Sequence, residues 1–159
     1  MNRIEAKDIM ATKLVTLRPE LDVSDAIDIL LKYKIAGAPV LDEDGQFLGV
    51  FSERNCMRVL VTGTYHEMPS AKVAAYMDPN PLTIDEHADL LAVAQLFLND
   101  PIRRLPVLKR GKLVGQVSRR DVLRAMQANT SFESRRDSRT HVPLYLSAVT
   151  NSLDEYPIN

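Results

Sequence analysis

The stretch Gly49-Val50-Phe51-Ser52-Glu53-Arg54-Asn55 has a counterpart in Gly115-Gln116-Val117-Ser118-Arg119-Arg120-Asp121, later in the same chain. Each stretch begins with a glycine, carries a serine at its fourth position and ends in a side chain with a carbonyl or carboxylate oxygen. Similarity that returns at a fixed distance is the signature of a repeated structural unit. The two stretches therefore predict a fold made from two copies of one unit.

The similarity extends toward the N-terminal side of both stretches. Ala38-Pro39-Val40-Leu41 matches Leu105-Pro106-Val107-Leu108, and Met10 matches Met77, at an offset of 67 residues (77 − 10 = 67). A one-residue deletion in the intervening turn lowers the offset to 66 at the glycines (115 − 49 = 66). We assign the chain to a first unit at 1–62, a linker at 63–70, a second unit at 71–128 and a C-terminal extension at 129–159.

Each unit has the same predicted order of elements, β-α-β-β-α. Apolar stretches rich in β-branched residues predict strands, apolar residues at helical spacing predict amphipathic helices, and Asp44-Gly45 and Arg110-Gly111 predict tight turns. Asp22 lies where the first helix needs a side-chain acceptor. The first unit has predicted strands at 14–17, 37–41 and 47–51, a helix from residue 23 and a closing helix over 53–61. The second unit has an opening strand at 82–84, a helix from residue 90 and a closing helix over 119–127.

The composition is that of an ordinary compact domain. The chain has 159 residues, of which 45% are hydrophobic, and a net charge of −1 (20 − 21). This near-neutral charge argues against nucleic acid as a partner, because such binding rests on many phosphate contacts. Cys56 has no second cysteine to pair with, which favours a reducing compartment. No apolar run is long enough for a membrane span, and the first residues lack the apolar core of a signal peptide, so we expect a cytoplasmic protein without a membrane partner.

The C-terminal extension belongs to neither unit. Residues 131–140 are polar, whereas residues 141–149 are apolar, with Pro143 placed to open a short helix. We expect this tail to pack on its own chain; covering a subunit interface and binding a partner protein are the alternatives.

The second of the two opening stretches has the chemistry of a phosphate and sugar site at a helix start. Gly115 lets a ligand approach the backbone closely, and the N-terminus of the following helix attracts a phosphate. Ser118 can donate a hydrogen bond to that phosphate, and the Asp121 carboxylate can accept from two ribose hydroxyls. The same Ser-x-x-Asp spacing also matches a helix capping box, in which these side chains satisfy the first turn of the helix. The residues by themselves leave both interpretations open.

With these landmarks the two units resemble a tandem pair of cystathionine-β-synthase (CBS) domains, an arrangement called a Bateman module. The resemblance runs from about Lys7 to Gln127. It implies an α/β (α+β) fold of two β-α-β-β-α units packed with pseudo-twofold symmetry, followed by a short C-terminal extension. It also implies a regulatory, energy- or ligand-sensing module that binds AMP, ADP, ATP or S-adenosylmethionine between its units, forms a homodimer and modulates an effector protein. Because no catalytic or transport domain is attached, we expect a stand-alone module that is not an enzyme.

The resemblance also implies which residues line the ligand site. In this family the segment that opens one unit lines the site carrying the acidic residue of the other unit. Carried over by position, the purine lies against Lys13, Leu14 and Val15. Ribose and phosphate are then held by residues of the second unit, namely Arg103, Ser118, Arg120 and Asp121. The corresponding weaker site of the first unit comprises Ala36, Ser52, Asn55 and Leu82.

This sister site departs from the family pattern at two positions. Ala36 stands where the second unit has Arg103, and Asn55 stands where it has Asp121. Alanine cannot bind a phosphate, and a neutral amide accepts through one oxygen only. We expect the sister site to be weak, empty or suited to a different ligand. The many basic residues near the second site favour an anion there, although a solvated basic surface explains them as well.

Two other interpretations remain for the whole chain. One is a ligand-free structural or dimerisation module that acts through protein–protein interaction. The other is an enzyme acting on nucleotides, which the absence of a positioned base or metal site argues against. His66, His87 and His141 are scattered and predict neither a metal site nor a catalytic group, and we interpret Cys56 as a small core residue.

Overall fold

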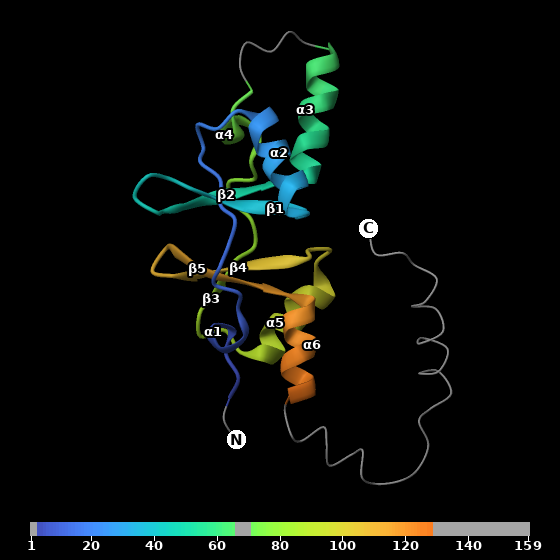
Figure 1. Ribbon diagram of the computed structural model, residues 1–159. Coiled ribbons are helices and arrows are strands. Elements are labelled where there is room, and N and C mark those ends of the chain that lie inside the picture. Colours follow the sequence, from blue (N-terminus) through green and yellow to red (C-terminus); the bar gives the residue numbers. More distant parts are fainter. Residues whose placement is uncertain (1–2, 66–70, 129–159) are drawn as a thin grey trace, which may run out of the picture. The chain divides into compact units, whose positions relative to one another are not determined.

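The computed structural model describes residues 3–65 and 71–128 (Figure 1). The elements of the first repeat are α1 (Ala6–Ile9), α2 (Val23–Tyr33), β1 (Gly37–Leu41), β2 (Phe47–Ser52) and α3 (Glu53–Tyr65). Those of the second repeat are α4 (Val73–Tyr76), β3 (Ile84–Asp85), α5 (Leu90–Asn99), β4 (Arg104–Lys109), β5 (Lys112–Ser118) and α6 (Arg119–Ala128). The prediction of a mixed α/β fold with two tandem units is confirmed, and both repeats lie in one compact unit that runs to Ala125.

Each repeat contains a hairpin at the place predicted. β1 pairs antiparallel with β2, and β4 pairs antiparallel with β5, while β3 adds a short parallel strand beside β4. Gly45 and Gly111 form the turns with φ angles of 79° and 76°, a conformation that glycine adopts without steric cost. In the first turn Asp42 Oδ1 accepts hydrogen bonds from the backbone N–H groups of Asp44 and Gln46, at 2.9 and 2.8 Å. The acidic segment before β2 is therefore a turn held by its own carboxylate.

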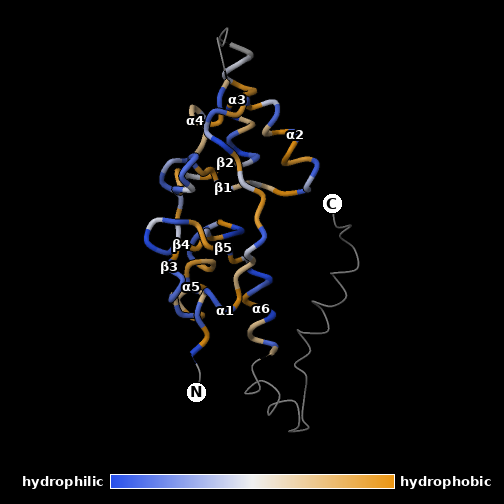
Figure 2. Tube along the Cα trace, turned by 60° about the vertical axis from the view of Figure 1, so that its left-hand side comes forward, coloured by the Kyte–Doolittle hydropathy of each residue, from blue (hydrophilic) through white to orange (hydrophobic). Residues whose placement is uncertain are grey.

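The longer helices cover one face of each hairpin and form two hydrophobic cores. Val23, Ala26 and Leu30 make the buried face of α2 and lie in one core with Phe51 of β2, which is fully buried. In the second repeat α5 and α6 cover β4 and β5 in the same way. Figure 2 shows hydrophobic positions (orange) recurring between hydrophilic ones (blue) along α2 and α6. The predicted amphipathic helices thus pack as their spacing requires.

The two repeats exchange their opening segments, which we define as residues 6–17 and 73–84. Ala6 of α1 is fully buried in the core of the second repeat, and Val73 of α4 is fully buried in the core of the first. Backbone hydrogen bonds hold both helices in place: the N–H of Ala6 donates to Ala88 at 2.8 Å, and the N–H of Val73 donates to Leu21 at 2.9 Å. Because each core is completed by a residue of the other repeat, neither core is complete without both repeats.

Two equivalent backbone bridges mark where the opening segments cross. Ala11 and Gln116 exchange both of their backbone hydrogen bonds, at 2.9 and 3.0 Å. Val50 and Asp78 do the same, at 2.9 and 2.8 Å. These pairs correspond under the sequence repeat, since Asp78 matches Ala11 and Val50 matches Gln116. Equivalent residues of the two sequence repeats therefore make equivalent backbone contacts in the structure.

The glycines that lead the two repeated stretches make these crossings possible. A Cβ atom on Gly115 would strike the Met10 side chain and lie 2.9 Å from the Ala11 carbonyl oxygen. A Cβ atom on Gly49 would strike the Asp78 carbonyl oxygen. The sequence predicted that Gly115 gives a ligand close access to the backbone. The structure shows instead that the chain's own opening segment approaches there.

Some predicted boundaries are wrong. The strand predicted at 14–17 is only a single bridge between Leu17 and Val40, because the residues before Leu17 face a cavity and have no neighbouring strand. Asp22 precedes α2 as predicted, but its carboxylate pairs with Lys72 at 2.8 Å and does not cap the helix. The closing helix α3 continues to Tyr65, into the predicted linker. The short helices α1 and α4 were not predicted.

Other expectations fall on residues that the structure does not describe. His66, the rest of the predicted linker, His141 and the C-terminal extension with Pro143 lie outside the described ranges, so the packing of the tail stays a prediction. Within residues 3–65 and 71–128, no helix combines the length and the apolar character needed to cross a bilayer.

Candidate functional site

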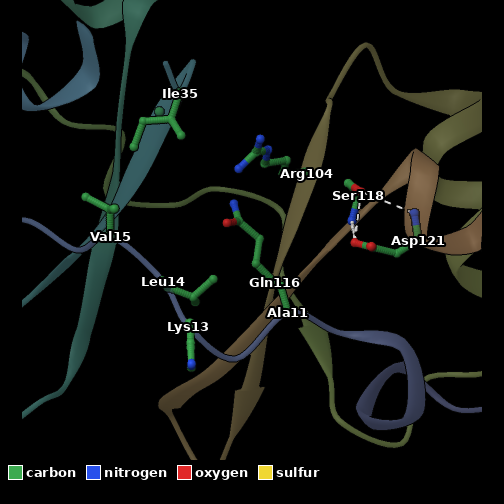
Figure 3. A pocket seen from close by; sticks show the side chains of 10 residues that line it. Ala11, Lys13, Leu14, Val15, Ile35, Arg104, Gln116, Ser118 and Asp121 are labelled. Carbon is green, nitrogen blue, oxygen red and sulfur yellow. Dashed lines mark hydrogen bonds between the residues drawn. The ribbon is translucent and has the colours of Figure 1, made fainter. Parts of the chain in front are cut away.

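A cavity of about 240 Å³ lies where the first opening segment meets β5 (Figure 3). Of the residues predicted for the main site, Lys13, Leu14, Val15, Ser118 and Asp121 line it. These residues are far apart in the sequence and meet because the backbone bridge to β5 holds the opening segment against the second hairpin. The predicted convergence of the two segments is therefore present in the structure.

Arg103 and Arg120 are not among the described residues that line this cavity; the guanidinium there belongs to Arg104. Arg104 is the cross-strand partner of Ser118, so their side chains project from the same face of the hairpin. Side chains alternate along a strand, and the register decides which of two adjacent arginines faces the cavity. The sequence shows both arginines but does not by itself give that register.

Four further lining residues were not predicted: Ala11, Ile35, Gly37 and Gln116. Ile35 and Gly37 belong to the first repeat, so both repeats bound the cavity. Gln116 follows from the alternation along β5, because it lies two residues before Ser118 on the same face. Val117, between them, points the other way and is fully buried in the core.

Ser118 and Asp121 form a capping box at the start of α6, as the dashed lines in Figure 3 mark. The N–H and Oγ–H of Ser118 both donate to Asp121 Oδ2 at 2.8 Å, and the N–H of Asp121 donates to Ser118 Oγ at 3.2 Å. The capping interpretation of this spacing is therefore correct. It leaves Asp121 Oδ1 with Arg124 as its one partner in the described chain, at 3.5 Å. One carboxylate oxygen thus remains an open acceptor beside the cavity.

Ser52 and Asn55 form the equivalent cap at the start of α3, with one chemical difference. The N–H and Oγ–H of Ser52 donate to Asn55 Oδ1 at 2.8 and 2.9 Å. Because these bonds use the single oxygen of the amide, the other end of the Asn55 side chain is an NH2 donor. Where the second repeat presents a charged acceptor, the first repeat presents a neutral donor.

The remaining sister-site residues are divided between two places. The Ala36 carbonyl accepts a hydrogen bond from the N–H of Glu53 at 2.9 Å, so Ala36 lies beside the Ser52–Asn55 cap. Leu82 lies in the second opening segment and is 39% exposed. Ligand binding at this site stays a prediction.

The lining of the cavity is apolar on one side and charged on the other. Leu14, Val15 and Ile35 give an apolar wall suited to a flat hydrophobic group. Lys13 and Arg104 are exposed at the edge and supply two positive charges, against one negative charge from the capping carboxylate. The site therefore favours a ligand that carries both an apolar ring and an anionic group.

The other candidate groups in the sequence lie away from this cavity. Cys56 belongs to the core of the first repeat, as predicted, and burial raises the pKa of its thiol. Among residues 3–65 and 71–128 there is no group of three or more His, Cys, Asp or Glu side chains placed to hold a metal ion.

Comparison with known proteins gives a family match over most of the chain. The model of the CBS domain matches residues 6–62 and 73–128. Inosine-5'-monophosphate dehydrogenase of Aquifex aeolicus is 32% identical over 112 residues, which are 69% of this chain and 22% of that enzyme. Protein MJ1225 of Methanocaldococcus jannaschii is 25% identical over 126 residues, which are 79% of this chain and 44% of that protein. The chain thus spans less than half the length of these two relatives.

Among solved structures, CBSX2 of Arabidopsis thaliana in complex with AMP resembles this chain with a TM-score of 0.68 and 30% sequence identity. The match covers 77% of this chain and 96% of CBSX2. At that coverage the similarity includes both repeats and extends over nearly the whole of the solved chain.

Proposed function

Because the chain belongs to the CBS-domain family, with one domain in each repeat, we propose that it is a regulatory module that binds an adenine nucleotide (AMP, ADP or ATP) in the cavity beside β5. The observation that carries this proposal is the convergence of Leu14 and Val15 with Ser118 and Asp121 around one cavity. The AMP complex of CBSX2, whose solved chain has a similar fold, supports the choice of ligand.

The lining suggests how the parts of the nucleotide are arranged. The purine lies against the apolar wall of Leu14 and Val15, and the ribose hydroxyls donate to Asp121 Oδ1, the oxygen that the cap leaves open. The cavity, at about 240 Å³, is smaller than the roughly 300–1,000 Å³ of most small-molecule pockets. The phosphate therefore extends to the edge, where Lys13 and Arg104 are exposed.

Regulation follows from the position of the cavity against both repeats. A ligand that contacts Ile35 and Gly37 as well as β5 stabilises one arrangement of the repeats over others. The resulting effect on an effector protein has an upper limit, set by the ligand's difference in affinity for the two arrangements. We propose that the effector is a separate protein or a further part of the same polypeptide.

We also propose that the chain forms a homodimer. Large apolar side chains are exposed on four of the described helices, among them Leu31 on α2 (71%), Met57 on α3 (58%), Leu98 on α5 (80%) and Leu123 on α6 (62%). A contact between two copies of the chain would remove such side chains from water, which is favourable in proportion to the apolar area buried. Sedimentation velocity at rising protein concentration tests this proposal, and a single monomeric species throughout would contradict it.

Isothermal titration with AMP, ADP and ATP tests the nucleotide site. Asp121→Asn changes the charge but is expected to keep the helix cap, because Asn55, at the equivalent position of the first repeat, accepts both hydrogen bonds from its capping serine. We expect the wild type to bind and Asp121→Asn to bind at least about tenfold more weakly, because charged hydrogen bonds contribute about 1.5–3 kcal/mol. Unchanged binding in this variant would remove the site assignment. If the wild type binds no adenine nucleotide, the result would favour the alternative, a ligand-free interaction module, in which both serine caps serve only to stabilise their helices.

A further inference from the structure

Among the described residues that line the cavity, Gln116 alone carries a side-chain amide, a neutral group that can both donate and accept hydrogen bonds. Its backbone N–H and carbonyl are both paired with Ala11, at 3.0 and 2.9 Å, which fixes the position of its Cα atom. Its side chain leaves β5 on the face that also carries Ser118. Figure 3 shows the amide extending into the space between Leu14 and Arg104. A neutral hydrogen-bonding group is thus held at a fixed place inside the cavity.

The side-chain amide of Gln116 is unpaired in the part of the chain that the structure describes. Within the described residues no backbone or side-chain group hydrogen-bonds it, although the residue is half-buried. The equivalent residue of the first repeat is Val50, which makes the same backbone bridge. The fold of the repeat therefore does not require an amide at this position. The Gln116 carboxamide, which faces the cavity without a partner in the described chain, can pair with a ligand that both donates and accepts.

The register of the hairpin places the amide at the base end of the proposed nucleotide site. Ser118, beside the ribose-binding carboxylate, faces Arg104 across the strands, whereas Gln116 faces Pro106. Two residues along a strand correspond to about 7 Å. Arg104 therefore leaves the hairpin level with Ser118, and its exposed side chain can reach the phosphate, while Gln116 leaves β5 one step further along, on the side of the apolar wall that receives the ring (Figure 3).

We infer that Gln116 is a specificity-determining residue that distinguishes adenine from 6-oxopurines; this inference rests on the proposed function. A carboxamide can accept from the 6-amino group of adenine and donate to the neighbouring ring nitrogen N7, a two-bond pairing. Hypoxanthine has an oxygen in place of the amino group, so the carboxamide oxygen meets a second acceptor and one bond is lost. The site is thereby selective for a 6-aminopurine nucleotide, and the base is read from a side chain that only the second repeat contains.

Titration of the full chain with AMP and with IMP, which share ribose and phosphate, tests this inference. We expect the wild type to prefer AMP and Gln116→Val, the residue of the first repeat, to lose that preference by roughly 5- to 150-fold. Gln116→Glu, which keeps the acceptor but cannot donate to N7, a nitrogen that both purines carry, provides a second test and is expected to weaken AMP and IMP alike while keeping the preference for AMP. Asp121→Asn serves as the matched control, since it is expected to weaken AMP and IMP equally and to leave the ratio unchanged.

The outcomes separate the two proposals. If the wild type prefers AMP and Gln116→Val keeps the same preference, or if Gln116→Glu loses it, the role of Gln116 is wrong while the nucleotide site stands. If the wild type binds AMP and IMP equally, the inference is also wrong. If the wild type binds neither nucleotide, the proposed function fails, and the inference fails with it.

Discussion

Asn55 and Asp121 hold equivalent places in the two repeats and accept the same pair of hydrogen bonds from the serine three residues earlier, yet only Asp121 carries a charge. Asn55 is 6% exposed, whereas Asp121 lies half-buried at a cavity. The same cap is thus compatible with two different ligand chemistries. Substitutions that exchange the two side chains separate the contribution to folding from the contribution to binding.

The exchange Asn55→Asp is expected to lower stability at neutral pH. It places a carboxylate in a buried position, and burial of a charge disfavours the ionised form. A carboxyl with a raised folded-state pKa destabilises the protein at high pH, and the loss is recovered as pH falls. We expect about 1–3 kcal/mol less stability at pH 7, measured by urea denaturation. Asp121→Asn is the control and is expected to change stability by less than about 0.5 kcal/mol; equal losses in both would contradict this account.

The two capping serines predict a matched pair of variants. Ser52→Ala and Ser118→Ala each remove the hydroxyl of a helix cap, so each should cost about 1 kcal/mol of unfolding free energy. Only Ser118 lines the cavity, so only Ser118→Ala should also weaken AMP binding. Chemical denaturation and calorimetric titration of both variants check this, and an equal loss of binding in Ser52→Ala would argue against the assignment of the ligand to the second repeat.

The crossing glycines should differ in their tolerance of a methyl group. Gly49 faces the rigid backbone of Asp78, whereas Gly115 faces the flexible side chain of Met10 as well as a carbonyl. We expect Gly49→Ala and Gly115→Ala to lose roughly 1–3 kcal/mol each, with the larger loss at Gly49. Urea midpoints give the order of the two losses.

A second substitution identifies the cause. Met10→Ala in the Gly115→Ala background should recover part of the loss, because it removes the flexible half of the clash. No recovery would mean that the Ala11 carbonyl alone is responsible. A fully stable Gly49→Ala protein would contradict the close crossing.

The ion pairs of the first opening segment predict acid sensitivity. The Glu5 carboxylate lies 2.9 Å from Lys7 Nζ and 3.0 Å from His87 Nδ1, and these two contacts, that of Lys7 the more strongly, lower the pKa of Glu5. The ion pair with Arg3 lowers the pKa of Asp89 in the same way. A carboxyl with a lowered folded-state pKa stabilises the fold above its ordinary pKa, and the contribution is lost as pH falls through the lowered value. We therefore expect the urea midpoint to decrease once the pH falls below the ordinary carboxyl pKa values, 4.5 for Glu5 and 3.8 for Asp89.

Neutral variants provide the comparison for this pH dependence. The double change Glu5→Gln and Asp89→Asn should lower the midpoint at pH 7 and flatten its decline in acid. Glu20→Gln, at an exposed carboxyl without a partner among the described residues, should leave the curve unchanged. A decline in acid that is the same in all three proteins would show that other groups are responsible.

The single thiol should react slowly in the folded protein. Cys56 is 9% exposed, and burial raises the pKa of its thiol, which lowers the fraction of reactive thiolate. We expect labelling with a thiol reagent at pH 8 to be much slower in buffer than in concentrated urea. Rapid labelling of the native protein would show that this end of α3 opens readily.

Patterns local to the chain predicted most of the fold. The hairpins at 37–41 and 47–51, the glycine turns and the buried face of α2 all depend on neighbouring residues, and the structure has them where the sequence placed them. The exchange of opening segments depends on contacts between residues such as Ala6 and Ala88, which no periodicity records. The predicted strand at 14–17 is reduced to the bridge between Leu17 and Val40, because Leu14 and Val15 line the cavity.

The candidate site shows the same division. Ser118 and Asp121 were identified from their spacing, and that spacing correctly predicted a cap. The strand register was needed to choose Arg104 over Arg103. Gly115 was predicted to let a ligand approach, but the segment that approaches it is the one containing Ala11. The alternation along β5 was sufficient to find Gln116 from the sequence, but the residues predicted for the main site from the second unit (Arg103, Ser118, Arg120 and Asp121) are all charged or hydroxyl-bearing.

The exchanged opening segments have a consequence for synthesis on the ribosome. Residues 6–11 leave the exit tunnel before the groups they bind, at Ala88 and Gln116, have been translated. Helix α1 and the residues after it therefore lack their binding surface in the second repeat until β5 has been translated. The bridge between Ala11 and Gln116 can form only after translation of β5, more than 100 residues later (116 − 11 = 105).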